Sequence, residues 1–79
     1  MSDRPIKHSL TLKGHRTSVT LEAEFWQAFR DIAAELDLGL NALAAQIDAG
    51  RGPDAGLASA IRVFVLRHYR PARGSLPDA

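Results

Sequence analysis

The chain has 79 residues, no cysteine and a formal net charge of +1, with 46% hydrophobic and 24% charged residues. This length allows one small domain and excludes a multidomain enzyme, while the lack of cysteine excludes disulfides, thiolate zinc sites and thiol catalysis. The composition is too apolar for a disordered chain, and no apolar run approaches the ~18 residues of a membrane span. Because so small a core is marginal alone, we expect a homodimer or higher oligomer. The first ten residues contain no apolar signal segment, so a cytoplasmic location is expected.

The first predicted element is a β-hairpin over residues 6–21. Apolar and polar residues alternate in its two halves, which is the pattern of half-buried strands. Gly14 can take the positive φ of a two-residue turn, so we expect Gly14 and His15 to form the loop as a type II′ turn. That register sets Lys13 opposite Arg16, a like-charge pair. Along the rest of the hairpin it pairs apolar residues with apolar residues or threonine, and polar residues with polar ones.

Three helices are expected after the hairpin, at about 22–37, 42–49 and 57–70, with Gly39 ending the first of them. Thr20 or a neighbour is the expected N-cap of the first helix, and Asn41 is the expected N-cap of the second. The fold class is therefore α+β, an N-terminal β-hairpin followed by three α-helices. The domain covers residues 6–70, between a disordered lead-in at 1–5 and a flexible tail at 71–79.

The last predicted helix is apolar around most of its circumference, which is typical of a helix held between two subunits. Three arginines, Arg62, Arg67 and Arg70, interrupt this apolar surface. We expect them to line a helix edge and to form ion pairs between subunits, with Glu22, Glu24, Asp31 or Glu35 of the partner subunit.

The charges are sorted along the chain. Residues 1–16 carry four basic side chains and one acidic one, residues 17–50 carry one basic and six acidic, and residues 51–79 carry five basic and two acidic. The near-neutral total therefore conceals basic segments at both ends. Such sorting is consistent with a nucleic-acid-binding face or with self-complementary contacts between subunits.

No catalytic or metal site is expected. No nucleophile lies in an arrangement that suggests an adjacent base, and a chain this short leaves no room for a deep pocket. The three histidines, His8, His15 and His68, lack the spacing of metal ligands. His8 falls on the buried face of the hairpin and His15 in its turn, so structural roles suffice. We expect no enzyme activity, no cofactor and no small-molecule substrate.

The segment from Arg16 to Glu22, followed by a helix, a glycine-containing turn with Asn41 and further helix, resembles the ribbon-helix-helix family of Arc/MetJ/CopG-type DNA-binding dimers. The stretches GHRTSVTLE, LNALAAQID and SAIRVFVLRHY look like a subfamily of small bacterial ribbon-helix-helix proteins. The resemblance implies an intertwined homodimer whose paired strands enter the major groove of double-stranded DNA.

The resemblance also implies roles for single residues. Base contacts are expected from the outward residues of the second strand, because arginine can bind guanine in a bidentate way and hydroxyls can serve several bases. Phosphate contacts are expected from lysines of the basic face and from backbone N–H groups at the start of the second helix. The base-contact residues are Arg16, Ser18 and Thr20; the phosphate-contact residues are Lys7, Lys13, Asn41, Ala42 and Leu43; the dimer core is Val19, Leu21, Phe25, Trp26, Phe29, Ile61, Phe64 and Val65.

A sequence-specific, DNA-binding transcriptional regulator is thus the first hypothesis, supported by an outer strand face without acidic residues. The additional strand at 6–12 puts entry of the sheet into the DNA groove in question. A four-stranded dimer sheet spans roughly 14 Å between outer strand axes, whereas the major groove is roughly 12 Å wide. The alternative is a protein-interaction or assembly module that binds copies of itself or a partner through the last helix and the exposed edge at 6–12. An antitoxin-like role is a variant of this alternative.

Overall fold

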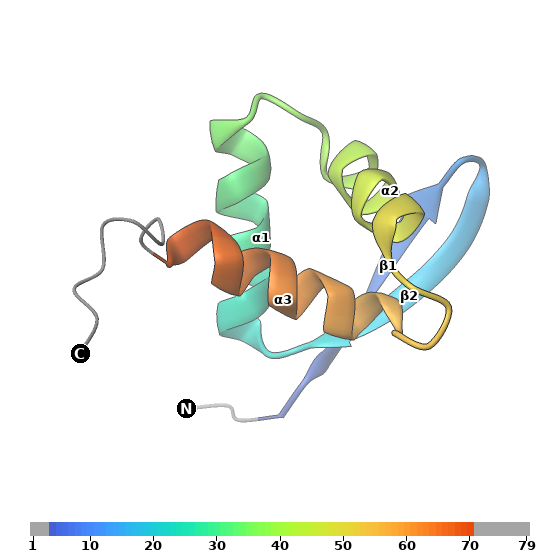
Figure 1. Cartoon of the computed structure of the whole chain (residues 1–79), viewed down its shortest axis with the longest axis horizontal. Helices are drawn as coiled ribbons and strands as arrows, with labels where there is room; N and C mark the ends of the chain where they lie inside the picture. The colour runs from blue at the N-terminus through green and yellow to red at the C-terminus, as the bar shows by residue number, and fades with distance from the viewer. Residues whose placement is uncertain (1–3, 71–79) are drawn as a thin grey trace.

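The structure is a computed structural model that describes residues 4–70 of the chain (Figure 1). It contains an antiparallel hairpin and three helices, which confirms the predicted fold class. The expectations for residues 1–3 and for the tail at 71–79 lie outside the described residues. The elements in chain order are β1 (Ile6–Leu12), β2 (His15–Leu21), α1 (Ala23–Glu35), α2 (Leu40–Gly50) and α3 (Leu57–Tyr69).

The hairpin turn differs from the predicted one. Its loop is Lys13–Gly14, with positive φ at both residues (53° and 82°), as in a type I′ turn, and His15 belongs to β2 opposite Leu12. The predicted pairing of Lys13 with Arg16 is therefore wrong, and Arg16 faces Thr11. The twist of a type I′ turn matches that of paired strands, and the observed register avoids the like-charge pair.

The error in register is two residues, so every side chain keeps its predicted face of the sheet. Only a one-residue slip would exchange the faces. Leu10 and Val19 are buried beneath the hairpin, although each has a different partner from the expected one, since Leu10 faces Thr17 and His8 faces Val19.

The helix boundaries also differ from the predicted ones. α1 ends in a Schellman motif, in which Asp37 has φ 56° and the N–H of Leu38 donates to the carbonyl of Ala33 at 2.9 Å. This motif ends α1 before Gly39, which is instead the N-cap of α2, so the assignment of Asn41 as N-cap is wrong. The N-cap of α1 is Glu22, two residues after Thr20, which remains in β2.

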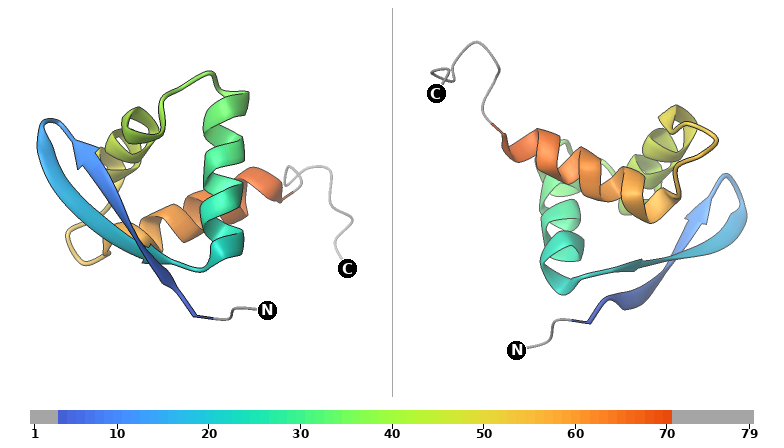
Figure 2. Two further views of the ribbon diagram at one scale, coloured as in Figure 1. Left: turned by 180° about the vertical axis from the view of Figure 1, so that it is seen from behind. Right: turned by 60° about the horizontal axis from the view of Figure 1, so that its bottom comes forward.

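The three helices lie on one side of the hairpin and cover its inner face (Figure 2). α2 packs against β1 and α3 against β2, and α1 and α2 both contact α3. The core between the two layers consists of fully or almost fully buried apolar side chains from all five elements. They are Leu10, Val19, Leu21, Phe29, Ile32, Ala33, Leu43, Ala44, Ile61 and Val65.

Most of the expected dimer core belongs to the interior of a single chain. Residues at 0–5% exposure have no surface to offer a partner, and they stabilise the protomer itself. Of the expected set, Val19, Leu21, Phe29, Ile61 and Val65 are buried in this way, whereas Phe25, Trp26 and Phe64 are half-buried.

One ion pair and one histidine–carboxylate contact tie α3 to α1 and its N-cap residue within the chain. Arg62 donates from Nε to Glu22 Oε1 at 3.0 Å, and the ring of His68 lies 3.0 Å from Glu35 Oε1. The expectation that Arg62 pairs with an acid of another subunit is therefore wrong. Both acidic partners lie more than 30 residues before their α3 partners, so the sequence could not distinguish a contact within the chain from one between chains.

Candidate nucleic-acid interface

The outer face of the hairpin consists of six side chains in three cross-strand pairs. Lys7 pairs with Thr20, Ser9 with Ser18, and Thr11 with Arg16. All six residues are exposed, because the helices cover only the opposite face of the sheet. The face holds two cations, four hydroxyls and no carboxylate, so it is a hydrogen-bonding surface with positive charges at diagonally opposite corners.

This geometry brings together the expected base-contact residues. Arg16, Ser18 and Thr20 follow one another at alternate positions of β2, so their side chains project from the same face. Lys7 joins them from β1, opposite Thr20. Lys13 does not, because it lies in the turn, where strand alternation no longer decides the direction of a side chain.

The expected phosphate-binding N-terminus of α2 begins one residue earlier than the resemblance implied. Gly39 caps the helix without a side-chain hydrogen bond, and the N–H of Leu43 already donates to the carbonyl of Gly39 at 3.0 Å. Leu43 is also 2% exposed. The N–H groups that precede the first intrahelical bond are those of Leu40, Asn41 and Ala42.

Each outer edge of the hairpin is partly closed by a side chain from the helices. On β1, the N–H of Thr11 donates to Asn41 Oδ1 at 3.0 Å. Since Thr11 directs its N–H away from β2, its partner Arg16 and the alternate residues of β2 also direct theirs outward. On the β2 edge, Arg62 Nη2 donates to the carbonyl of Thr20 at 3.3 Å.

The roles of these two residues at the strand edges were not predicted from the sequence. Asn41 was expected to be the N-cap of a helix, but its side chain fixes β1 to α2. Arg62 binds Glu22 through two nitrogens and lies 5.9 Å from the centre of the Phe25 ring. Its side-chain hydrogen bonds hold the pKa of the Glu22 carboxyl below the usual value of 4.5. The sequence indicated Arg62 as an arginine that interrupts an apolar helix and Glu22 as one of its possible partners, but the expected contact lay between subunits.

The inner face near the N-terminal end of the hairpin contains an aromatic stack. The ring of His8 lies parallel to the indole of Trp26, with 3.8 Å between ring centroids and 3° between planes. The expected buried-face position of His8 is thus correct, and its Nε2 is buried without a hydrogen-bond partner. Trp26 in turn lies 5.9 Å from the Phe29 ring, so the stack joins β1 to the core of α1.

A sequence profile of the ribbon-helix-helix domain matches residues 5–69, which include the hairpin and all three helices. The chain belongs to the ribbon-helix-helix family. Domains of this family typically form dimers, bind DNA as regulators or serve as antitoxins, and they are generally not enzymes. No curated protein and no solved structure matches the chain.

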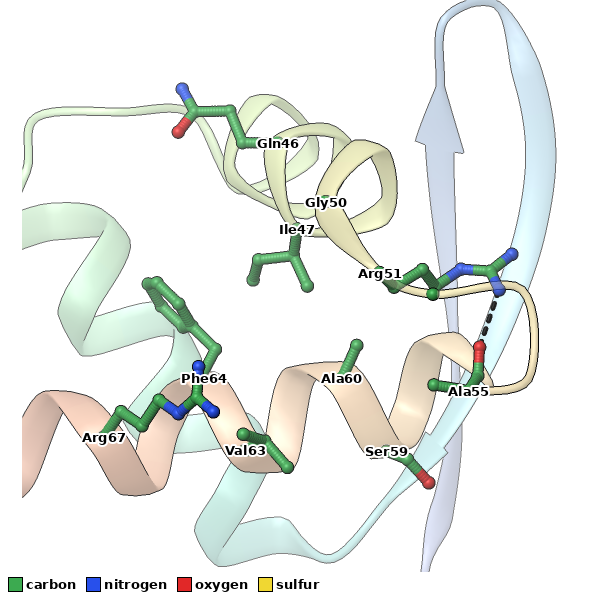
Figure 3. Close-up of a pocket in the computed structure, with 11 residues that line it drawn as sticks. Gln46, Ile47, Gly50, Arg51, Ala55, Ser59, Ala60, Val63, Phe64 and Arg67 are labelled. Atoms are coloured by element: carbon green, nitrogen blue, oxygen red, sulfur yellow. Dashed lines mark hydrogen bonds between the residues drawn. The ribbon is translucent and has the colours of Figure 1, made fainter.

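This ribbon-helix-helix chain also carries a second surface, on the side of α3 that faces away from the core. A groove of about 470 Å³ runs between α2 and α3 (Figure 3). The side chains of Ile47, Ala60 and Phe64 point into the space between the two helices. Val63, which lines the groove, is 45% exposed, and Leu66 on the same helix is 55% exposed. The two apolar faces expected for the last helix are therefore one buried face and one exposed face.

Residues 4–70 were also compared with the requirements of a metal site and of a membrane-spanning helix. No three histidine, aspartate or glutamate side chains of this part of the chain gather where they could hold a metal ion. None of the three helices is long and apolar enough to cross a bilayer.

Proposed function

We propose that the protein is a sequence-specific, DNA-binding transcriptional regulator that acts as a dimer through the outer face of its hairpin. The observation that carries the proposal is the composition of that face, which is exposed and holds cations and hydroxyls without any carboxylate. Neutralisation of backbone phosphates dominates DNA affinity, and an acid-free face avoids the repulsion that would oppose it.

The DNA contact proposed for each residue follows from the chemistry of its side chain or backbone. Arg16 reads guanine through its two-pronged guanidinium, and Ser18 and Thr20 add adaptable hydroxyl contacts. Lys7 contacts a phosphate at the margin of the face, and Lys13 does so from the turn. At the start of α2, the N–H groups of Leu40, Asn41 and Ala42 are proposed as the phosphate-contacting groups, with Leu40 in place of Leu43.

The hairpin is narrow enough that a single protomer can supply both strands that enter one groove. Two paired strands span about 5 Å between axes, and a major groove roughly 12 Å wide admits a two-stranded ribbon. In this chain both strands of such a ribbon come from the same molecule. We therefore propose that the dimer contact lies away from the hairpin edges, on the outward side of α3, where Val63, Leu66 and Tyr69 are exposed.

The test is a fluorescence-anisotropy titration of the protein with fragments of its own promoter at two salt concentrations. Arg16→Ala is compared with Arg30→Ala, which removes the same charge from an exposed position on α1. Loss of a bidentate base contact costs about 1–3 kcal/mol, so Arg16→Ala is expected to weaken binding roughly 5- to 150-fold and to relax sequence preference. Lys7→Ala is expected to weaken binding to all sequences and to reduce the salt slope by about one.

Two results would reject the proposal. The first is an absence of binding to any fragment at low salt. The second is equal weakening by Arg16→Ala and Arg30→Ala, which would mean that only the net charge matters and that the hairpin face makes no particular contact.

The second candidate function is a protein-interaction or assembly module, which includes an antitoxin-like role. The groove between α2 and α3, which Val63 lines, and the exposed side chain of Leu66 on α3 favour it. Light scattering over a range of concentrations distinguishes the two candidates. A plain dimer that binds DNA supports the regulator, whereas a concentration-dependent higher oligomer without DNA binding supports assembly.

A further inference from the structure

A second hollow, of about 300 Å³, lies between the tip of the hairpin and the corner where α2 passes into α3. Residues from both strands and the turn form one wall, and residues from the end of α2, its C-cap and the start of α3 form the other. The hollow is lined by Leu12, Lys13, His15, Thr17, Asp48, Arg51 and Leu57. It is on the helix side of the hairpin and is thus distinct from the outer face proposed to contact bases.

Three of the residues that line this hollow carry hydrogen-bond donors without partners of their own. Among the described residues, the side chains of Lys13, His15 and Thr17 make no hydrogen bond and no ion pair. Lysine, histidine and threonine offer ammonium, ring N–H and hydroxyl donors respectively. Uncommitted donors around one concave space are the elements of a site for an anion.

Arg51 supplies the opposite wall in a fixed orientation. Its Nε donates to Asp48 Oδ1 at 2.7 Å and its Nη1 donates to the carbonyl of Ala55 at 2.6 Å. Figure 3 shows the guanidinium turned away from the α2–α3 groove and toward this carbonyl. These two bonds use two of its five N–H groups, so three remain for a ligand. Asp48 is the one acidic side chain in the lining, and it is occupied by Arg51.

The backbone of Lys13 gives an independent indication. Its φ of 53° lies in the left-handed region, where the first position of a type I′ turn strongly favours glycine, asparagine or aspartate. A lysine at this position destabilises the turn relative to those residues. Strained positions of this kind tend to occur at ligand sites, and here the strained residue borders the hollow.

We infer that the hollow beneath the hairpin tip is a binding site for a phosphate group, held by Lys13, His15 and Arg51. The apolar side chains of Leu12 and Leu57 leave room for a small organic body attached to it. The phosphate can be carried by a free small molecule or by the DNA backbone. In both cases it would bridge the hairpin tip and the helical layer, because its ligands come from both. The inference does not depend on DNA binding by the outer face.

The test uses inorganic phosphate as the probe and records amide chemical shifts of the full-length protein by NMR. Titration with phosphate, against sodium chloride of the same ionic strength, is expected to shift amides at 12–17 and 48–57 in a saturable way. Lys13→Gln is expected to weaken phosphate binding roughly tenfold, the effect of losing one charge-assisted contact. Arg30→Gln removes the same charge from an exposed position on α1, outside both proposed surfaces, and is expected to leave phosphate binding unchanged. A well-dispersed spectrum shows that each variant is folded.

DNA titrations of the same variants distinguish the two sources of the phosphate. If the source is the DNA backbone, phosphate competes with DNA, and Lys13→Gln weakens binding to every sequence. If the source is a free ligand, Lys13→Gln loses phosphate binding while its DNA affinity equals that of Arg30→Gln. The inference is overturned if phosphate shifts these amides no more than chloride does, or if the two variants bind phosphate equally. Failure of the DNA titration alone leaves the site intact and counts against the proposed function.

Discussion

Helix α3 presents a buried face and an exposed face, and a matched pair of substitutions measures what each does. Ile61→Ala and Leu66→Ala both remove three carbon atoms, but Ile61 is 0% exposed and Leu66 is 55% exposed. For Ile61 the lost transfer free energy is about 2.4 kcal/mol, at roughly 0.8 kcal/mol per carbon. The residual cavity adds about 1 kcal/mol, giving about 3–4 kcal/mol. The total free energy of unfolding of a chain of this size is roughly 4–12 kcal/mol.

Leu66→Ala is expected to cost under about 1 kcal/mol in the isolated protomer, since most of the side chain is already in water and no cavity forms. Urea denaturation followed by circular dichroism at two protein concentrations tests both values. The loss of unfolding free energy in Ile61→Ala should be the same at both concentrations. A loss in Leu66→Ala that grows with concentration would locate a subunit contact on α3. The reasoning is refuted if Ile61→Ala costs less than Leu66→Ala in dilute solution.

Three smaller effects follow from the hairpin and its contacts. Asn41→Ala removes the acceptor of the Thr11 N–H and is expected to cost about 0.5–1 kcal/mol and to speed hydrogen exchange of that amide; unchanged exchange would contradict this. Gly14→Ala meets no atom within 4 Å, so its expected cost of about 1 kcal/mol, measured by urea midpoint, comes from the positive φ alone. Because the pKa of Glu22 is lowered in the folded state, its contribution to stability is present above the usual value of 4.5 and is lost as the pH falls through the lowered one. An NMR titration of its carboxyl should show the pKa rising in Arg62→Gln.

The hairpin could be predicted from the sequence in its faces but not in its register. The two-residue alternation decides which side chains are buried, and it is the same for registers that differ by two. The choice between loops depended on Lys13 adopting a positive φ, which is uncommon for lysine. An expectation based on Gly14 alone therefore placed the turn one residue too late.

The helix ends and the contacts of single polar residues were harder to predict, because distant segments decide them. Asn41 has the chemistry of an N-cap, yet its side chain binds a strand edge 30 residues earlier. Asp37 ends α1 by adopting the left-handed conformation, for which Gly39 was the obvious candidate. Arg62 finds Glu22 only because α3 crosses the start of α1. These pairings depend on the packing of the layers, and neither periodicity nor charge counts contain that information.

Because His8 stacks on Trp26, tryptophan fluorescence can report on the contact between the hairpin and the helical layer. Trp26 is the only tryptophan in the sequence, so its emission comes from a single, known place in the fold. Its indole lies face to face with an imidazole from β1, on the far end of the hairpin from the turn. Any ligand or nucleic acid that tilts or lifts this strand must separate the two rings and expose the indole to water. The intrinsic fluorescence of the unlabelled protein thus reports directly on movement of its ribbon.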